Sequence, residues 1–354
     1  MTTHNRAPDW LLIALLLALF ALGLAALYTA GGEARFEVQL WRGLAGIALM
    51  LGIAFLPPRF LEAATPVFFA GVLLSLVAVL FFGVKINNAR RWLDAGVLLQ
   101  PSELMKIALP MCIAYWYCRF KEADWRHHLA AAALIVPPVL LIMRQPDLGT
   151  ALMAAAAGML AIFFGGVGWR WIAGFVGALP VFGLAAWHLL LKPYQKKRVL
   201  TLFDPQQDPL GAGYHTIQSE IAIGSGGIWG KGFLSGTQAQ FGFLPERHTD
   251  FIFSVFAEEF GLAGGVLMLG LAVLITWRSL FVAGRAATMF AFLSAAGVAG
   301  IFFATFAVNL SMVSGLLPVV GMPLPLVSYG GTALLSTFAG FGVVLSASRT
   351  RRHG

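Results

Sequence analysis

The sequence predicts an all-α polytopic membrane protein with about ten transmembrane helices, in a single domain that covers residues 1–354. Hydrophobic residues make up 59% of the chain, charged residues only 11%, and the mean hydropathy is +0.81. A soluble globular domain contains roughly 45–50% apolar residues. The apolar runs are long enough for transmembrane helices, which need about 20 residues, whereas strands of a membrane barrel would give short alternating segments.

The apolar runs define ten expected spans, which charged and Pro/Gly-rich stretches separate. These spans are Trp10–Ala30, Val38–Leu56, Ala64–Gly83, Ser102–Cys118, Leu129–Met143, Leu148–Phe164, Trp171–Leu191, Phe251–Trp277, Ala286–Val308 and Gly331–Ala347. The first run is longer than the about 7–15 apolar residues of a signal peptide, so we expect a retained helix. Cys112 and Cys118 lie in one apolar run on different helix faces, so neither a disulfide nor a metal site is expected there.

An even number of spans places both termini on one side of the membrane. If that side is the cytoplasm, the inner loops and tails hold eleven of the 24 Lys and Arg residues but only four of the 16 acids. The outer side holds the other thirteen Lys and Arg residues and twelve acids, but six of the thirteen lie in one long loop. Long loops carry less weight in the positive-inside rule, so the cytoplasmic side is favoured for the termini. The net charge of +8 then belongs to loops beside a membrane, so nucleic acid is not expected as a partner.

Two segments on the outer side are unusual. Residues 192–249 form a long outer loop between the seventh and eighth spans, far longer than ordinary helix connections. The apolar segment Asn309–Gly330 is interrupted by Pro318, Pro323 and Pro325. A continuous helix is not expected there, and irregular backbone at membrane depth requires protein or a water-filled cavity around it.

Three of the expected helices begin with an acidic residue on the outer side. Their first residues read "QPSELMK" with Glu103, "QPDLGT" with Asp147 and "HTDFIF" with Asp250. One acid in a first turn is explained by the helix dipole, which contributes roughly 0.3–1 kcal/mol. Three acids at one depth, with Lys106 one turn below Glu103, favour a shared polar cavity.

Other charged residues are candidates for the same cavity. Glu258 lies about 80° around a continuous helix from Asp250, and Glu259 lies on the opposite side. At most one of the two is expected to share the Asp250 cavity, while the other caps or pairs with a neighbouring helix. Basic candidates near the same mouth are Arg90, Arg91, Lys231 and Arg247. Because Arg91 precedes Trp92, an interfacial anchor is an equal alternative for it.

These motifs together resemble the SEDS family of bacterial cell-wall proteins, and within it the branch that acts in cell elongation. The resemblance covers nearly the whole chain. It rests on "RRWLDAGVLLQPSELMKIALP", "RQPDLGTAL", "RVLTLFDPQQDPLGAGYHTIQSEIAIGSGGIWGKGFLSGTQ", "FLPERHTDFIFSVFAEEFG" and "VSGLLPVVGMPLPLVSYGGT". It implies a peptidoglycan glycosyltransferase in the bacterial cytoplasmic membrane, with both termini cytoplasmic and an active site on the outer face that polymerises lipid II.

The resemblance also implies roles for individual residues. Asp250 matches the family's catalytic position, and Arg247 and His248 are implied substrate contacts. Glu103, Lys106 and Asp147 fall on positions that line the family's cavity. The implied partners are the substrate lipid II, a class B penicillin-binding protein that supplies transpeptidation, and other membrane proteins of the elongation complex.

The implied reaction agrees with the residues. A sugar hydroxyl attacks an anomeric carbon while a polyprenyl pyrophosphate leaves, and a carboxylate such as Asp250 is suited to act as general base, worth roughly 10²–10⁴-fold. Cations, or a divalent metal such as Mg²⁺ or Mn²⁺, stabilise pyrophosphate charge, although no residue is assigned to a metal. Two alternatives remain at this stage: a flippase or transporter for the same lipid, and a non-catalytic membrane scaffold of the cell-wall machinery.

Overall fold

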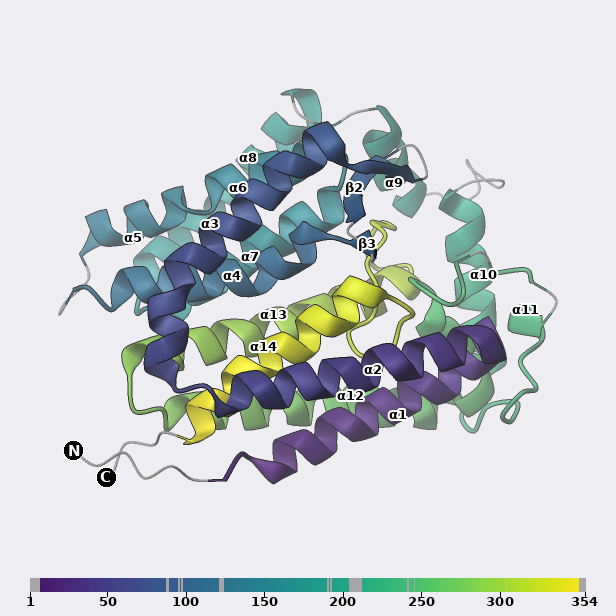
Figure 1. The fold of residues 1–354 in the computed structure, drawn as a ribbon. Coiled ribbons are helices and arrows are strands. Elements are labelled where there is room, and N and C mark those ends of the chain that lie inside the picture. The colour runs from purple at the N-terminus through teal and green to yellow at the C-terminus, as the bar shows by residue number, and fades with distance from the viewer. Residues whose placement is uncertain are drawn as a thin grey trace.

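The computed structural model describes residues 7–86, 89–94, 96, 98–120, 124–189, 191, 193–203, 212–240, 242–244 and 246–349. Helices dominate the described part, and one small sheet accompanies them (Figure 1). The helices are α1 (Trp10–Gly31), α2 (Glu33–Phe55), α3 (Pro58–Phe82), α4 (Pro101–Tyr117), α5 (Trp125–Ala133), α6 (Val136–Arg144), α7 (Leu148–Phe164), α8 (Trp169–Leu189), α9 (Pro193–Phe203), α10 (Ala212–Ser225), α11 (Thr237–Gln240), α12 (Ile252–Gly284), α13 (Met289–Val313) and α14 (Gly331–Arg349), and the strands are β1 (Val84–Ile86), β2 (Ala89–Asp94) and β3 (Leu98–Leu99).

The predicted helical membrane fold is confirmed. Within the described residues, seven helical segments are long and apolar enough to cross a membrane, namely α1, α2, α3, the α5–α6 pair, α12, α13 and α14. The other three expected spans correspond to the shorter α4 and α7, of 17 residues each, and to α8, of 21 residues. The α5–α6 break falls at Leu134 and Ile135, just before Pro137 and Pro138 in the first turn of α6, which lack the N–H groups that a continuous helix needs.

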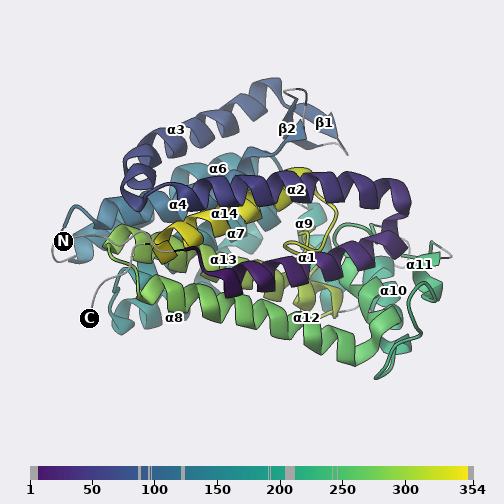
Figure 2. The same ribbon diagram turned by 60° about the horizontal axis from the view of Figure 1, so that its bottom comes forward.

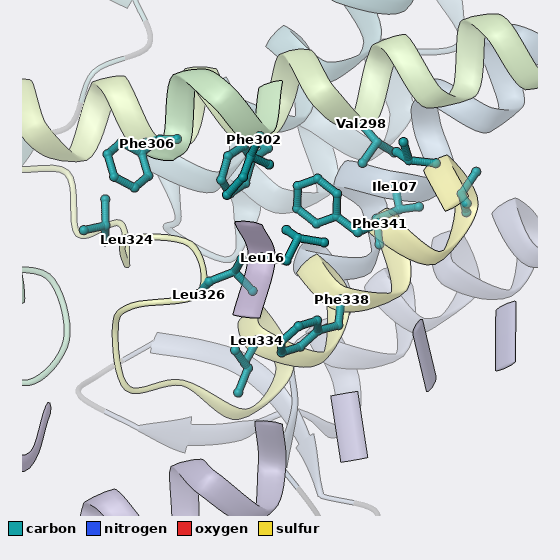
Figure 3. Packing of buried hydrophobic residues seen from close by; sticks show 14 of the residues in the cluster. Leu16, Ile107, Val298, Phe302, Phe306, Leu324, Leu326, Leu334, Phe338 and Phe341 are labelled. Atoms are coloured by element: carbon teal, nitrogen blue, oxygen red, sulfur yellow. The ribbon is translucent and has the colours of Figure 1, made fainter. Parts of the chain in front are cut away.

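The helices lie side by side, with α13 and α14 enclosed by the others (Figures 1 and 2). The start of α1 and the end of α14 lie at one end of the bundle, and the sheet, α10 and α11 lie at the opposite end. Side chains from several elements fill the centre, and Phe302 packs edge-on against Phe341 with ring centroids 5.1 Å apart (Figure 3). Leu16, Ile107 and Leu326 come into the same cluster from α1, α4 and the segment after α13 (Figure 3).

Helix α12 is interrupted at Gly261, where the backbone has φ 63° and ψ −164°. The ring of Phe253 lies 3.4 Å from the position that a Cβ on Gly265 would take. In a straight helix those two residues would be about 18 Å apart along the axis. Residues 252–260 and 262–284 therefore form a helical hairpin rather than one inward span.

Contacts with α1 fix the direction of the two arms. Arg278 pairs with Asp9 at the start of α1 (2.8 Å), and Thr29 near the end of α1 donates to the Glu259 carboxylate (3.1 Å). Residues 262–284 thus follow α1 along its length, and residues 252–260 lead up to the break. Asp250 lies just before the short arm 252–260, at the end of that arm away from the break at Gly261, which differs from the single helix Phe251–Trp277 that the sequence predicted.

The segment between α13 and α14 enters the bundle without forming a helix. Leu324 and Leu326 are 1% and 2% exposed, and the Cα of Val327 approaches the place of a Cβ on Gly23 of α1 to 2.6 Å. Glycine at position 23 is what allows this close approach. The expected broken segment is confirmed, and we call residues 314–330 the re-entrant segment.

The end of the bundle that holds the sheet carries structure that the sequence did not predict. Strands β1, β2 and β3 form an antiparallel sheet beyond the end of α3. The long loop 192–249 contains α9, α10 and α11 in its described part. Several of its residues, including Asp204 and Asp208, lie outside the described residues.

Candidate active site

The turn that carries Asp250 is tied to the re-entrant segment through its backbone. The Tyr329 N–H donates to the His248 carbonyl (2.9 Å), and the Ser328 hydroxyl donates to the Thr249 carbonyl (2.6 Å). The next carbonyl, that of Asp250, accepts from the Asn309 amide on α13 (2.9 Å). Three consecutive carbonyls are therefore held.

The re-entrant segment is itself held by α2. Gln39, which is 1% exposed, donates to the Ser328 carbonyl (2.9 Å) and accepts from the Gly330 N–H (3.3 Å). The Ser328 hydroxyl also accepts from the Leu324 N–H (2.7 Å). Buried backbone groups need such partners, since an unpaired one costs about 1–3 kcal/mol.

Charges of both signs surround the Asp250 carboxyl. Burial, and secondarily the negative charges of Glu246 and Asp147, raise the pKa of Asp250 to about 7, while Arg198 and Arg91 act in the opposite direction. The carboxyl is enclosed by protein, although the residue as a whole keeps some accessible surface. Among the described residues, none donates a hydrogen bond to this carboxylate, which leaves its oxygens available to a substrate.

Asp147, the second acid near Asp250, lies at the start of α7. It caps that helix by accepting from the Thr150 N–H (3.2 Å), and only 3% of its side chain is exposed. Arg91 on β2 reaches it (3.7 Å) and donates to the Pro146 carbonyl (2.6 Å). The unpredicted sheet therefore delivers the arginine, and the alternative of a pure interfacial anchor for Arg91 does not describe these contacts.

The re-entrant segment forms one wall of this site. Gly321 has φ +73° and lies against Asp250, whose Oδ2 is 3.5 Å from the place of a Cβ. Arg198 on α9 donates to the Val319 carbonyl (3.1 Å), which places its guanidinium on the same wall. The structure thus brings together Asp250, Asp147, Arg91 and Arg198.

Glu103 and Lys106 are paired with each other on the inner side of the re-entrant segment. Their charged atoms are 2.7 Å apart. They line a cavity of about 370 Å³, counted with the solvent space at its mouth, and an adjoining one of about 280 Å³. The second is lined by residues 323–326 and Ser328, but neither is lined by Asp250. The cavity shared by Glu103, Asp147 and Asp250 stays a prediction.

Arg247 and His248 lie at the rim, both partly exposed. Burial, with the positive charges of Arg35 and Arg247, lowers the pKa of His248, so this imidazole is neutral at neutral pH. Its ring packs against Tyr329 at 6.0 Å between centroids, and Arg42 covers the Tyr329 ring at 5.1 Å.

Lys231 and Glu258 form a separate cluster two turns away from Asp250. Glu258 is 0% exposed and accepts from Lys231 (2.6 Å) and from the Thr237 N–H (2.9 Å) at the start of α11. Its partner Glu259 accepts from the Leu234 N–H (3.0 Å). Both acids hold the loop around the hairpin break, so the structure does not bring Lys231 or Glu258 to Asp250.

Sequence reasoning missed several residues that shape the site. Asn309, 0% exposed, is a lone amide in the apolar α13, and that isolation was a usable signal. Arg198 was not among the basic candidates. His215 on α10 stacks on Phe251, beside Asp250, with centroids 5.8 Å apart, and nothing in the local sequence marks it.

The possible divalent cation has no evident protein site in the part of the chain described. No group of three His, Cys, Asp or Glu side chains there is arranged to hold a metal ion.

Known proteins are similar to this chain in sequence and in fold. The family model described as "Cell cycle protein", covering FtsW, RodA and SpoVE, matches residues 9–353. The chain belongs to this family. The peptidoglycan glycosyltransferase MrdB of Escherichia coli K12 is 45% identical over 98% of this chain and 94% of its own length.

Solved structures agree with this family assignment. The Thermus thermophilus rod shape determining protein RodA has a TM-score of 0.72 and 32% identity, over 98% of this chain and 99% of that chain. A chain from a peptidoglycan synthase complex that coordinates polymerization and crosslinking has a TM-score of 0.83 and 35% identity, over 97% of this chain and 98% of that chain. The predicted family is confirmed, and the chain is a multi-pass membrane protein of the RodA type.

Proposed function

We propose that the chain is a peptidoglycan glycosyltransferase that joins lipid II units into glycan strands during cell elongation, with Asp250 as the general base. Relatives that are similar over nearly their whole length are named peptidoglycan glycosyltransferases. The observation that carries the residue assignment is an enclosed carboxyl with a pKa of about 7 in a turn held at three consecutive carbonyls. A base is most effective when its pKa lies near the working pH.

The proposed step is a single displacement. The acceptor's sugar hydroxyl attacks the anomeric carbon of the donor, and the bond from that carbon to the pyrophosphate oxygen breaks. Asp250 takes the hydroxyl proton, and the polyprenyl pyrophosphate leaves with the electron pair. Arg198 and Arg91 lie where positive charge stabilises the leaving group.

The remaining predicted substrate contacts fall into two groups according to their position. Arg247 and His248 at the rim contact the substrate where it enters. Glu103 and Lys106, on the inner side of the re-entrant segment, support that wall and contact the substrate only if the segment moves.

Substitution of Asp250 by Asn tests the base assignment. This variant keeps the side-chain size but cannot accept the proton, so polymerisation of lipid II by the purified protein should be lost. Glu37→Gln on α2 removes an exposed carboxyl and serves as the matched control. Near-normal synthesis by well-folded Asp250→Asn protein would refute the assignment.

The transporter alternative requires polar groups that continue toward the inner end. Among described residues, the buried charged side chains are Asp9, Glu103, Asp147, Glu258 and Glu259. Only Asp9 lies at the inner end, where Arg278 neutralises it. This distribution favours chemistry at the outer end. Purified protein that moves lipid II across a vesicle bilayer without polymerising it would favour the transporter instead.

The partner and the orientation belong to the same proposal. The similarity to a complex that couples polymerization to crosslinking supports a class B penicillin-binding protein as partner. Both termini are cytoplasmic, and the Asp250 site faces outward. Single cysteines at the exposed positions Ser235 and Gly284, in a chain with Cys112 and Cys118 replaced, test this with an impermeant thiol reagent on intact cells. Labelling is expected at 235 only, and the reverse pattern would refute the proposal.

A further inference from the structure

Asn309 on α13 links the turn that carries Asp250 to the re-entrant segment, which forms one wall of the site. Its Nδ2 donates to two carbonyls, that of Asp250 at 2.9 Å and that of Met322 at 2.6 Å. The residue is 0% exposed, and its Oδ1 is buried without a hydrogen-bond partner in the described chain. Both acceptors are backbone carbonyls, so the NH₂ group has to face them and the oxygen has to face away.

This arrangement is not the best one for stability alone. A buried acceptor without a partner costs about 1–3 kcal/mol. The same amide supplies two donors at one point, which no hydroxyl or carboxylate side chain does. An unsatisfied buried group in a folded protein calls for a specific explanation, and the position of its two acceptors supplies one.

Met322 directly follows Gly321, the residue that lies against the Asp250 carboxylate. One amide thus fixes the backbone of Asp250 relative to the wall that its side chain faces. We propose that Asn309 is a positioning residue, which sets the reach of the Asp250 carboxylate to the acceptor hydroxyl and keeps that carboxyl enclosed. This rests on the proposed role of Asp250 as base.

Asn309 is neutral, so its removal leaves the charges around Asp250 unchanged. Those titratable or charged groups are Glu246 in the same turn, Arg198 on α9, Asp147 at α7, Arg91 on β2 and, across Phe251, His215 on α10. Burial lowers the pKa of His215, so it does not ionise near pH 7. A looser turn admits water to the carboxylate, and hydration lowers the pKa of Asp250 toward its ordinary value.

The test compares Asn309→Ala and Asn309→Asp in the full-length protein with a matched control. Ser294→Ala removes a fully buried, unpartnered hydroxyl elsewhere on α13 and touches nothing in the site. Rates of lipid II polymerisation are measured against substrate concentration and pH, per folded molecule. We expect kcat to fall roughly 10- to 100-fold, since misplacement by about 1 Å has effects of that size. We expect KM to change little, and Ser294→Ala to match the natural protein.

The pH profile separates positioning from simple support of the fold. In Asn309→Ala the acidic midpoint of kcat should move to lower pH. Asn309→Asp keeps the size but cannot donate when ionised, so it should not restore kcat. A normal kcat per folded molecule, or a lowered kcat with an unmoved acidic midpoint, would overturn the proposal. If Asp250→Asn stays active, the base assignment fails instead, and that result is distinct from failure of the positioning role of Asn309 alone.

Discussion

A buried base with a raised pKa makes the folded protein less stable when it ionises. The pKa of Asp250 rises from 3.8 to about 7 on burial. Below pH 3.8 the proton is bound in both the folded and the unfolded state, and the free energy of unfolding is unaffected. Between those values only the folded state keeps the proton, so the free energy of unfolding falls as pH rises, and above about 7 the full penalty is present.

The size of this penalty follows from the difference between the two values. Each factor of ten in proton affinity corresponds to about 1.4 kcal/mol, so Asp250 costs roughly 4 kcal/mol at most at pH 8. Asp250→Asn removes the charge and keeps the shape. We therefore expect the inactive variant to be more stable than the natural protein at pH 8, with a gap that nearly closes toward pH 4.

Thermal unfolding of the purified protein in one detergent, followed by intrinsic fluorescence at several pH values, measures this gap. A gain of several kcal/mol in a protein of this size raises Tm by several degrees. Glu37→Gln, at an exposed position, should show no such pH-dependent gain. An Asp250→Asn protein that is no more stable at pH 8, or equally stabilised at pH 5 and pH 8, would show that the carboxyl is not enclosed as described.

Three further predictions concern the site and its supports. Because Asp250 must be ionised to act, kcat should rise with pH to a midpoint near 7 and be roughly one-tenth of its plateau at pH 6; a profile that is flat from pH 5.5 to 8 would contradict this. Lys231→Met leaves the fully buried Glu258 without its cation, which costs about 3–5 kcal/mol, so Tm should fall while KM for lipid II stays unchanged in the folded fraction. A raised KM with a normal Tm would instead return Lys231 to the substrate site. Gly321→Ala places a residue with a side chain at a backbone φ of +73°, which costs about 1–2 kcal/mol. In the same two assays it should lower kcat more than Tm. An unchanged kcat would show that this wall is not part of the site.

The sequence predicted the helices well because hydropathy records burial in lipid directly. It did not predict the direction in which the chain runs within an apolar segment, because the hydropathy is the same whether the helix continues or folds back. The break at Gly261 is the example: apart from Glu258 and Glu259 the stretch Phe251–Trp277 carries no charge, and the chain reverses at one glycine. The sheet was missed for another reason, since its strands have only three, six and two residues and no alternating pattern.

For the site, the sequence located the acids but not their grouping. The negative charge of Asp147 acts on Asp250, and both residues lie just before a helix. Glu103 lines two cavities beside the re-entrant segment, whose path no local pattern encodes, and its place in a cavity shared with Asp250 stays a prediction. Glu258 and Glu259 were placed on a continuous helix, and the hairpin places both against the same loop.

The sequence predicted the charged residues of this site but not the neutral polar residues that hold its backbone. Irregular backbone inside a membrane protein has to find hydrogen-bond partners within the protein. Gln39, Asn309 and Ser328 supply them, and each does so by binding a carbonyl next to the site rather than by pointing at a substrate. The bonds that allow the re-entrant segment to exist at this depth are therefore the bonds that hold the Asp250 turn. The charged residues of the sequence indicate the base. The residues that hold the base are identified only through the hydrogen-bond partners of the buried carbonyls.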